Sequence, residues 1–457
     1  MTPTSATRAI VEFSTRFDYR QIPPEVVQQG KLIILDTIGA MLAASDPQYP
    51  GSRIIIDFAR ALGGPPESSI IGRDFKVPTV SAALANGTLG YTCDIEPHST
   101  HAVLHSPAAV VPTSLAIGER GHSDGKAYLA SVILGVDVAT RVSMALHPVF
   151  LYERTYHPSG VAGVFGTAAA AGVLLGLNAV QFENAYGLAA TQAGGLLAFA
   201  ADETENSRPF NPGAAARNGV TSALLASMGF GGPQGMFDAE AKYNMYIAFS
   251  KGGFPERLTD KLGEHFLIMD YCIKLYACCS FLHAGLDGLL DILSAERVAT
   301  PDISEIVLHY PKSGAAMIDN NPLKSHCAQY ILPVAAVNRR VMLGEVLQER
   351  SQDPAVARLV ERTRVVYSEE LDPFYPTEHP AIVEVALNDG RRYTRRVDWA
   401  RGTPPNPIST EELEAKFVEL ATTVVSKRRA GQIIDAVYGL EGMQDVSELA
   451  RLLQVRE

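Results

Sequence analysis

The stretch from Val161 to Ala201 is dense in alanine and glycine, and this feature limits the possible folds more than any other. Within it, Val161–Leu177 is apolar on nearly every face, as is Lys126–Ala145 earlier in the chain. A helix that is apolar all round belongs inside a core. Small side chains let helix backbones approach closely. The sequence therefore predicts a tightly packed helical bundle, which Pro23–Ala44 and Thr79–Tyr91 extend with further helices.

A different texture begins near Phe266. The segments with strand character there are Glu305–Tyr310, Ala381–Leu387 and Arg391–Val397. Asn388-Asp389-Gly390 separates the last two and is a strong hairpin-turn signal. The segments with helical character are Leu282–Ser294 and Ala328–Leu343. Helices mixed with a small sheet predict an α+β domain.

Helical texture returns after the prolines at 404, 405 and 407, from Thr410 to Leu453. We therefore predict a mainly α protein with a smaller α+β domain. The helical domain is expected to contain residues 1–266 and 401–457, and the α+β domain residues 267–400. A chain of 457 residues is too long for one ordinary core, in agreement with two domains.

Composition and charge exclude several classes of protein. Hydrophobic residues make up 47% and charged residues 19%, so the chain can bury large cores. The net charge of -11 disfavours nucleic acid as a partner, because phosphate binding needs a basic surface. The Val161–Leu177 run contains glycines and is too weakly apolar for a membrane span, so no membrane partner is expected. The odd number of cysteines, five, and the absence of a visible targeting segment predict a cytoplasmic protein.

The densest polar stretch runs from Asp94 to His105 and includes His98 and His101. It follows one helix of small residues and precedes another apolar helix, Ala108–Ile117, so we expect a loop, where catalytic groups commonly lie. Three interpretations remain open from the residues alone: a solvated loop, an acid–base site, or a metal site. The spacing fits no known metal motif.

A second constellation is Tyr156-His157-Pro158-Ser159-Gly160, directly before the Ala/Gly helix. Ser159 or Gly160 can cap that helix. His157 would then lie near the positive end of the helix dipole, which lowers an imidazole pKa and favours a neutral base. The alternative is a structural histidine, buried and hydrogen-bonded near a helix start.

Two cations complete the candidates. Arg208 follows the polar run Asp202–Ser207, so it is expected on a loop, either solvated or as a bidentate clamp for a carboxylate. Lys274 lies in an apolar, aromatic stretch, where a lysine is costly unless it is paired. It is interpreted as a partner of a carboxylate or as a lysine of lowered pKa. The adjacent Cys278-Cys279 are interpreted as inert thiols in apolar surroundings.

These four pieces, in this order and across essentially the whole chain, resemble the MmgE/PrpD family. The segments that most resemble the family's sequences are Leu104-His105-Ser106, Ala215-Ala216-Arg217-Asn218-Gly219 and Ile273–Cys279 with His283. The family includes 2-methylcitrate dehydratase, cis-aconitate decarboxylase and iminodisuccinate epimerase. The resemblance implies a helical domain, an α+β lid domain and a homodimer.

The resemblance also implies roles for residues. Its catalytic positions fall on Asp94, His105, His157 and Lys274, and its substrate-binding positions include His283. We expect His105 and His157 to act as base and acid, with Asp94 orienting a histidine. Arg208 and Lys274 are expected to hold carboxylates.

Other positions complete or modify this set. His98 and Tyr330 are expected to contact the substrate. Members of the family commonly have a lysine at the position of Arg208. They commonly have a tyrosine at the position of Val334, one turn after Tyr330.

The expected function is that of a cofactor-independent lyase acting on a small di- or tricarboxylic acid. It would move a proton at a carbon next to a carboxylate, without a metal. Dehydration and decarboxylation rank first. The alternatives are an epimerase or isomerase of a small dicarboxylate, and an inactive protein that binds small acids.

Overall fold

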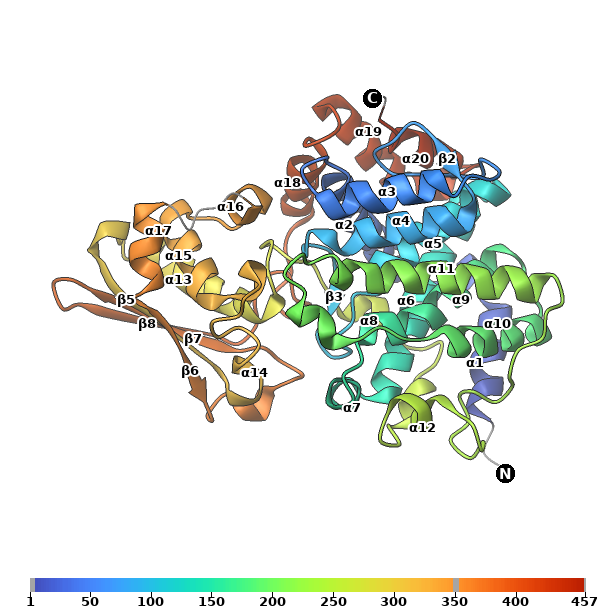
Figure 1. The fold of residues 1–457 in the computed structure, drawn as a ribbon, viewed down its shortest axis with the longest axis horizontal. Helices are drawn as coiled ribbons and strands as arrows, with labels where there is room; N and C mark the ends of the chain where they lie inside the picture. The colour runs from blue at the N-terminus through green and yellow to red at the C-terminus, as the bar shows by residue number, and fades with distance from the viewer. Residues whose placement is uncertain (1–4, 348–352, 456–457) are drawn as a thin grey trace. The chain divides into compact units, whose positions relative to one another are not determined.

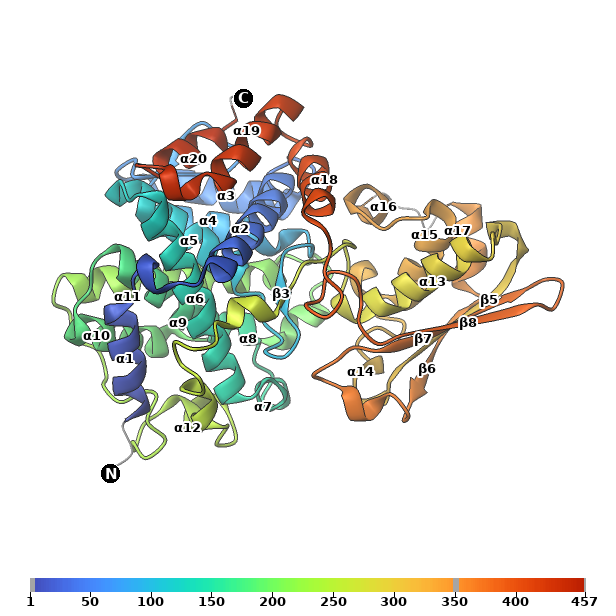
Figure 2. The ribbon, with the colours of Figure 1, turned by 180° about the vertical axis from the view of Figure 1, so that it is seen from behind.

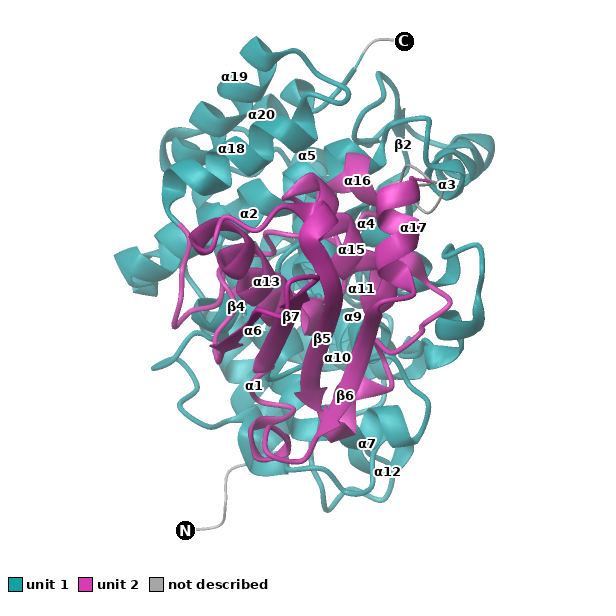
Figure 3. Ribbon diagram, turned by 90° about the vertical axis from the view of Figure 1, so that its left-hand side faces the viewer, with its two compact units in different colours: residues 1–92, 96–271, 409–457 teal, residues 93–95, 272–408 magenta. Residues whose placement is uncertain are grey.

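The computed structural model describes residues 5–347 and 353–455. The chain divides into two compact units, coloured separately in Figure 3. Unit 1 comprises residues 1–92, 96–271 and 409–457, and unit 2 comprises residues 93–95 and 272–408. We predicted domain limits at 266/267 and 400/401, so the compact units end a few residues later in both places. No sequence pattern signals that Cys93–Ile95 associate with unit 2.

Unit 1 is built from helices. They are α1 (Ala6–Arg16), α2 (Pro24–Ala44), α3 (Pro50–Ala61), α4 (Thr79–Thr92), α5 (Pro107–Gly121), α6 (Gly125–Leu146), α7 (Pro148–Glu153), α8 (Pro158–Val161), α9 (Gly163–Leu174), α10 (Ala179–Gln192), α11 (Ser207–Ser227), α12 (Met245–Phe249), α18 (Thr410–Ala421), α19 (Lys427–Tyr438) and α20 (Ser447–Leu452). The short pieces β1 (Ser68–Ser69) and β2 (Lys76–Val77) pair as an antiparallel hairpin. Figure 2 shows the C-terminal α18 beside α2, so the end of the chain returns to the helical unit.

Helix α11 packs along both α4 and α9, and in Figure 1 it runs beside α4. Glycines permit this approach. A Cβ on Gly213 would lie 2.2 Å from the Oγ1 of Thr88 in α4, and a Cβ on Gly219 would lie 2.0 Å from the Oγ1 of Thr167 in α9. The predicted tight bundle of small-residue helices is thus confirmed.

The predicted helices Pro23–Ala44, Thr79–Tyr91 and Lys126–Ala145 are confirmed to within two residues as α2, α4 and α6. The buried helix predicted at Val161–Leu177 is confirmed as α9, with shorter bounds, because Val161 belongs to the preceding α8 and Ala162 lies between the two helices. Gly160 in α8 approaches the backbone of Gly194 closely. A Cβ on Gly160 would lie 2.2 Å from the carbonyl oxygen of Gly194.

Unit 2 contains a four-stranded sheet with helices. Its elements are α13 (His283–Ala295), β5 (Ile303–Pro311), α14 (Lys312–Ala315), α15 (Ala328–Asn338), α16 (Leu343–Leu347), α17 (Pro354–Val360), β6 (Thr363–Ser368), β7 (Ala381–Leu387) and β8 (Arg392–Val397). The strand order is β6-β5-β7-β8, with β5 parallel to β6 and antiparallel to β7. Helix α13 packs on β7 and β8, and α15 packs on β6 (Figure 3).

The three predicted strands and the hairpin are confirmed as β5, β7 and β8, and Gly390 adopts a φ of 89° in the turn. Strand β6 was not predicted. The helix predicted at Ala328–Leu343 is too long, because Arg339 adopts a φ of 60° and ends α15 at Asn338. A left-handed residue directly after a helix is a common stop.

Two helices, α2 and α6, are long and apolar enough to cross a membrane by length and composition. Their most apolar windows are 83% and 94% buried inside the structure. Such burial is typical of core helices, and it accounts for their apolar faces without a lipid environment.

Candidate functional site

The segment between the end of α4 at Thr92 and the start of α5 at Pro107 is a loop, as predicted. His101 is exposed, but most of the other polar side chains of the loop are buried. Glu96 is fully buried, Asp94 is 4% exposed and His98 is 6% exposed. Burying ionisable groups is costly unless they are paired or hydrogen-bonded. The interpretation as a solvated loop is therefore wrong, and the burial favours a site.

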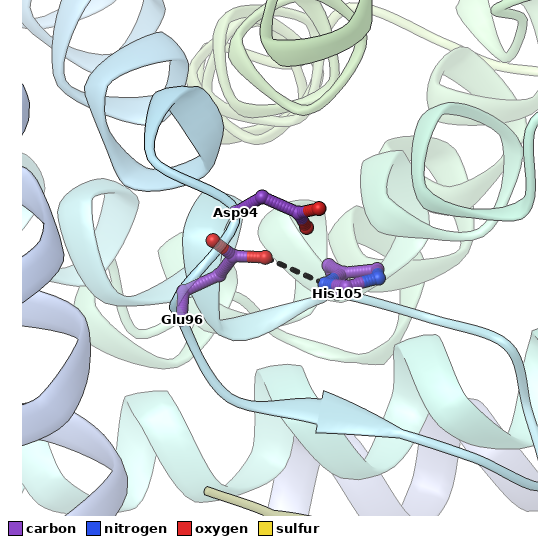
Figure 4. Close-up of side chains that lie close together, drawn as sticks. All are labelled: Asp94, Glu96 and His105. Atoms are coloured by element: carbon purple, nitrogen blue, oxygen red, sulfur yellow. Dashed lines mark hydrogen bonds and ion pairs between the residues drawn. The ribbon is translucent and has the colours of Figure 1, made fainter. Parts of the chain in front are cut away.

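Glu96 contacts the first of the two candidate histidines. Its Oε1 lies 2.6 Å from the Nδ1 of His105. Figure 4 marks this contact with a dashed line. The His105 side chain is 12% exposed, so the ring is mostly enclosed. We predicted that Asp94 orients a histidine, whereas the structure places Glu96 on His105. The sequence signal for Glu96 was a second carboxylate in the same loop, two residues after Asp94.

Tyr91, in the last turn of α4, lies against three of the predicted site residues. Its ring centroid is 4.5 Å from that of His105 and 5.9 Å from that of His157. The Cζ of Arg208 is 4.7 Å from the same centroid, within the range of a cation–π contact. The structure thus brings His105, His157 and Arg208 around one aromatic ring. Tyr91 was not predicted as a site residue, because in the sequence it resembles a core residue of the helix.

His157 is buried at the start of α8, as predicted, with 3% of its surface exposed. Its backbone N–H donates to the carbonyl oxygen of Gly195 at 2.9 Å, and its ring centroid lies 4.9 Å from that of Phe199. The Nδ2 of Asn211, on α11, lies 3.0 Å from its Nδ1. Asn211 is a second residue that the sequence analysis missed.

Burial lowers the pKa of His157 from 6.5 to about 3, with smaller contributions from His105 and Arg208. Burial therefore favours the neutral imidazole that the sequence predicts, and desolvation is its largest cause. The predicted caps are wrong. His157 itself precedes α8, and Ala162 precedes α9.

Ser159 has a different task from capping. Its Oγ accepts a hydrogen bond from the backbone N–H of His105 at 3.1 Å, which joins the two histidine segments. The ring of His98 stacks on that of His105, with the two centroids 5.5 Å apart. Three of the predicted site histidines therefore share one neighbourhood within unit 1.

Arg208 is only 2% exposed and lies in the first turn of α11. The expectation of a loop position is therefore wrong, and so is the solvated alternative. Its Nη2 lies 3.4 Å from the carbonyl oxygen of Thr92 and 3.9 Å from Oε2 of Glu205. A guanidinium is always charged and presents a planar fork of donors. It can bind a carboxylate beside the two histidines.

Lys274 and Asp94 form a buried ion pair. The Nζ of Lys274, which is 1% exposed, lies 2.6 Å from Oδ1 and 2.9 Å from the backbone oxygen of Asp94. Asp94 has a φ of 52°, an uncommon backbone conformation for a residue other than glycine. Of the two interpretations offered for Lys274, the carboxylate partner is the one the structure contains.

The other predicted residues of unit 2 are buried near helix starts. His283 begins α13, and its Nε2 lies 3.3 Å from the carbonyl oxygen of Cys278. Burial raises the pKa of the Cys278 thiol well above its ordinary value, which supports the interpretation as an inert thiol. Tyr330 is buried in α15, and the Nζ of Lys324 lies 5.6 Å from its ring centroid. Val334, on the same helix, is fully buried.

The loop also contains a group of potential metal ligands. One ligand atom each of Asp94, Glu96 and His105 lie within 4.8 Å of one another (Figure 4). Asp94 also faces the ammonium of Lys274, and the Nδ1 of His105 lies at hydrogen-bond distance from Glu96. These contacts fit an acid–base site.

Comparison with known proteins gives a consistent match. The MmgE/PrpD N-terminal domain matches residues 8–257, and the MmgE/PrpD C-terminal domain matches residues 276–440. A cis-aconitate decarboxylase-like protein of Aspergillus oryzae is 29% identical over 98% of this chain and 97% of its own length. The cis-aconitate decarboxylase of Aspergillus terreus is 27% identical over 98% and 95%, and that of Homo sapiens is 27% identical over 94% and 90%.

Proposed function

Because the chain belongs to the MmgE/PrpD family, we propose that it is a cofactor-independent lyase that acts on a small di- or tricarboxylic acid. Relatives named as carboxy-lyases over nearly the full chain support a decarboxylase or dehydratase. Identities of 27–29% leave the particular acid to experiment.

The observation that carries this proposal is the set of buried groups around Tyr91. A base supported by a carboxylate, a neutral imidazole and a fixed guanidinium all contact one ring. A carbon next to a carboxylate is a very weak acid, so its ionisation needs a base in contact and positive charge where the dianion develops. His105 and His157 would handle the proton, and Arg208 would hold a carboxylate. Lys274, His283, His98 and Tyr330 are proposed to complete the substrate contacts.

The chemistry balances without a cofactor. In dehydration, the base takes the proton from the carbon next to the carboxylate, and the leaving hydroxide takes a proton to become water. In decarboxylation, carbon dioxide leaves with the bond electrons remaining on carbon, and a proton returns to that carbon. In both reactions negative charge develops on carbon and is delocalised into a carboxylate that remains attached to it, which a buried cation stabilises more strongly than water does.

Two histidines beside one ring would also serve an epimerase or isomerase, in which the proton returns to the other face. A single experiment distinguishes these outcomes. Proton NMR in deuterated water, with citrate, 2-methylcitrate, cis-aconitate and iminodisuccinate, should show a new alkene for dehydration or a shortened skeleton for decarboxylation. Deuterium incorporation with an unchanged skeleton would identify the enzyme as an epimerase and contradict the lyase proposal. No change with any of these or other small dicarboxylates would leave only a binding protein.

The His157→Ala variant tests whether the reaction uses the site around Tyr91. We expect a loss of at least about 100-fold in turnover, as for other acid–base groups. The matched control is His122→Ala, since His122 lies outside this cluster and 75% of its side chain is exposed. Full turnover in His157→Ala would remove the site from the proposal.

We further propose a cytoplasmic location, from the cysteine content and the absence of a visible targeting segment, and a homodimer, from the family resemblance. Light scattering on the purified protein, across a range of concentrations, should give about twice the chain mass of 49.1 kDa. A monomer mass at all concentrations would contradict the dimer. Cell fractionation with soluble marker proteins tests the location.

A further inference from the structure

The two candidate histidines have different hydrogen-bond partners, and this difference concerns their protons. The Nδ1 of His105 faces a carboxylate oxygen of Glu96 at 2.6 Å, whereas the Nδ1 of His157 faces the amide nitrogen of Asn211 at 3.0 Å. A neutral imidazole has one N–H donor and one bare acceptor nitrogen. The partner on Nδ1 therefore decides what Nε2 can do.

The Asn211 amide can be oriented from its second contact. The same Nδ2 lies 3.5 Å from the carbonyl oxygen of Leu196, which can only accept a hydrogen bond. With the amide reversed, its oxygen would face that carbonyl oxygen. The nitrogen therefore points toward both groups and donates to Nδ1 of His157. Because a neutral ring that accepts at Nδ1 carries its proton on Nε2, the reactive nitrogen of His157 is an N–H donor.

His105 has the opposite arrangement. An ionised carboxylate can only accept a hydrogen bond, so the 2.6 Å contact with Glu96 places the ring proton of His105 on Nδ1. The Nε2 of His105 is then the unprotonated nitrogen. A carboxylate on the far side of an imidazole stabilises the cation that forms when this nitrogen takes a proton.

We propose that Glu96 and Asn211 are positioning residues that fix opposite tautomers on the two histidines. His105 is thereby the base that removes or returns the substrate proton through Nε2. His157 is a neutral donor whose Nε2–H binds the carboxylate oxygen on which negative charge grows. The assignment rests on the proposed proton transfer and makes it more specific, since one histidine moves the proton and the other stabilises the charge.

The burial of His157 suits this role. It is 3% exposed, packed on Phe199 and Tyr91, and near the positive charge of Arg208. These surroundings lower its pKa and keep the ring neutral across the physiological range. A neutral N–H in a dry site is a hydrogen-bond donor that needs no protonation step.

The test reads the tautomers directly, by ¹⁵N NMR of protein with labelled histidines near pH 8, where imidazoles are neutral. The signals are assigned by comparison with His105→Gln and His157→Gln. We expect the proton of His157 on Nε2 and that of His105 on Nδ1. The opposite tautomer at either ring would overturn the assignment for that ring.

The Asn211→Asp variant should reverse His157, because a carboxylate of nearly the same shape can only accept a hydrogen bond. We expect the proton to move to Nδ1 and turnover to fall about 100-fold, with little change in KM, as for the loss of one charge-stabilising donor. Asn211→Ala, which imposes neither tautomer, should lose less. A reversed tautomer with full turnover would overturn the role of His157, and an unchanged tautomer would overturn that of Asn211.

The tautomers can be measured without any substrate, so this test is independent of the proposed function. If the wild-type rings carry the expected protons but no acid reacts, the tautomer assignment is supported and the lyase proposal fails. If an acid reacts while the rings carry the opposite protons, the lyase stands and the positioning roles fail.

Discussion

Two buried lysine–aspartate pairs invite comparison, because they have the same chemistry in different regions. In unit 1, the Nζ of Lys416 on α18 lies 2.6 Å from Oδ1 of Asp36 on α2. In unit 2, the Nζ of Lys274 lies 2.6 Å from Oδ1 of Asp94. All four side chains are at most 6% exposed. Distance and burial alone therefore do not separate a structural pair from a functional one.

The backbone does separate them. Asp36 and Lys416 project from regular helices, and their pair ties the C-terminal α18 to the second helix of the chain. Asp94 has a positive φ and lies in the same loop as Glu96 and His105. Irregular backbone that is held by its surroundings is more frequent at functional sites than in frameworks. We therefore assign the first pair to folding and propose the second for catalysis.

The largest expected effect comes from replacing each pair as a whole. Asp94→Asn with Lys274→Met should reduce turnover about 1000-fold, because it removes a fixed charge from a dry site. Asp36→Asn with Lys416→Met should keep turnover within about twofold. Neither double variant leaves a buried charge unpaired, so both should fold. Turnover is measured per folded molecule, with circular dichroism as the check. Equal turnover in the two variants would abolish the distinction.

A smaller effect is expected from the buried arginines. Arg208→Lys removes the planar fork stacked on Tyr91, so KM should rise about tenfold with a smaller change in kcat. The matched control is Arg141→Lys. Arg141 is equally buried, but it pairs with Asp137 at 2.7 Å in the framework of unit 1. That variant should lose stability and keep its KM. A raised KM in the control alone would reverse the comparison.

The acid sensitivity of folding should depend on His157 more than on the structural pair. Its pKa is 6.5 ordinarily and about 3 in the folded protein, so the unfolded chain binds more protons between these values. Stability contributed by the neutral ring is fully present above about pH 6.5 and is lost as the pH falls toward 3. The loss from pH 7 to pH 5 is about 2 kcal/mol.

Urea unfolding at these two pH values checks this prediction. His157→Gln should show a smaller loss of stability on acidification than the wild type. The Asp36→Asn, Lys416→Met variant should retain the full histidine contribution. An identical pH dependence in wild type and His157→Gln would mean that the ring is protonated in the folded protein.

The smallest effect is expected from removal of metals. Dialysis against a strong chelator should leave turnover within about twofold, because Glu96 and Lys274 already occupy the positions facing His105 and Asp94. Elemental analysis before and after dialysis provides the control. A loss of activity that zinc or magnesium restores would convert the Asp94, Glu96 and His105 group from an acid–base site to a metal site.

The sequence by itself determined many of the helices and strands. Apolar faces predicted α2, α4 and α6, the Asn388-Asp389-Gly390 turn predicted the hairpin, and family-like motifs singled out His105, His157 and Lys274. These signals are local, since periodicity and turn chemistry depend on neighbours in the chain.

Only the tertiary structure decided the partners. The contact of Asn211 with His157 joins elements 54 residues apart, and the contact of Glu96 with His105 depends on how one loop folds back on itself beside Tyr91. The same holds for Arg208, which lies in a helix rather than a loop, and for His157, whose pKa is lowered mainly by burial. Hydrogen-bond direction and desolvation depend on what surrounds a side chain in space, and no local pattern encodes that.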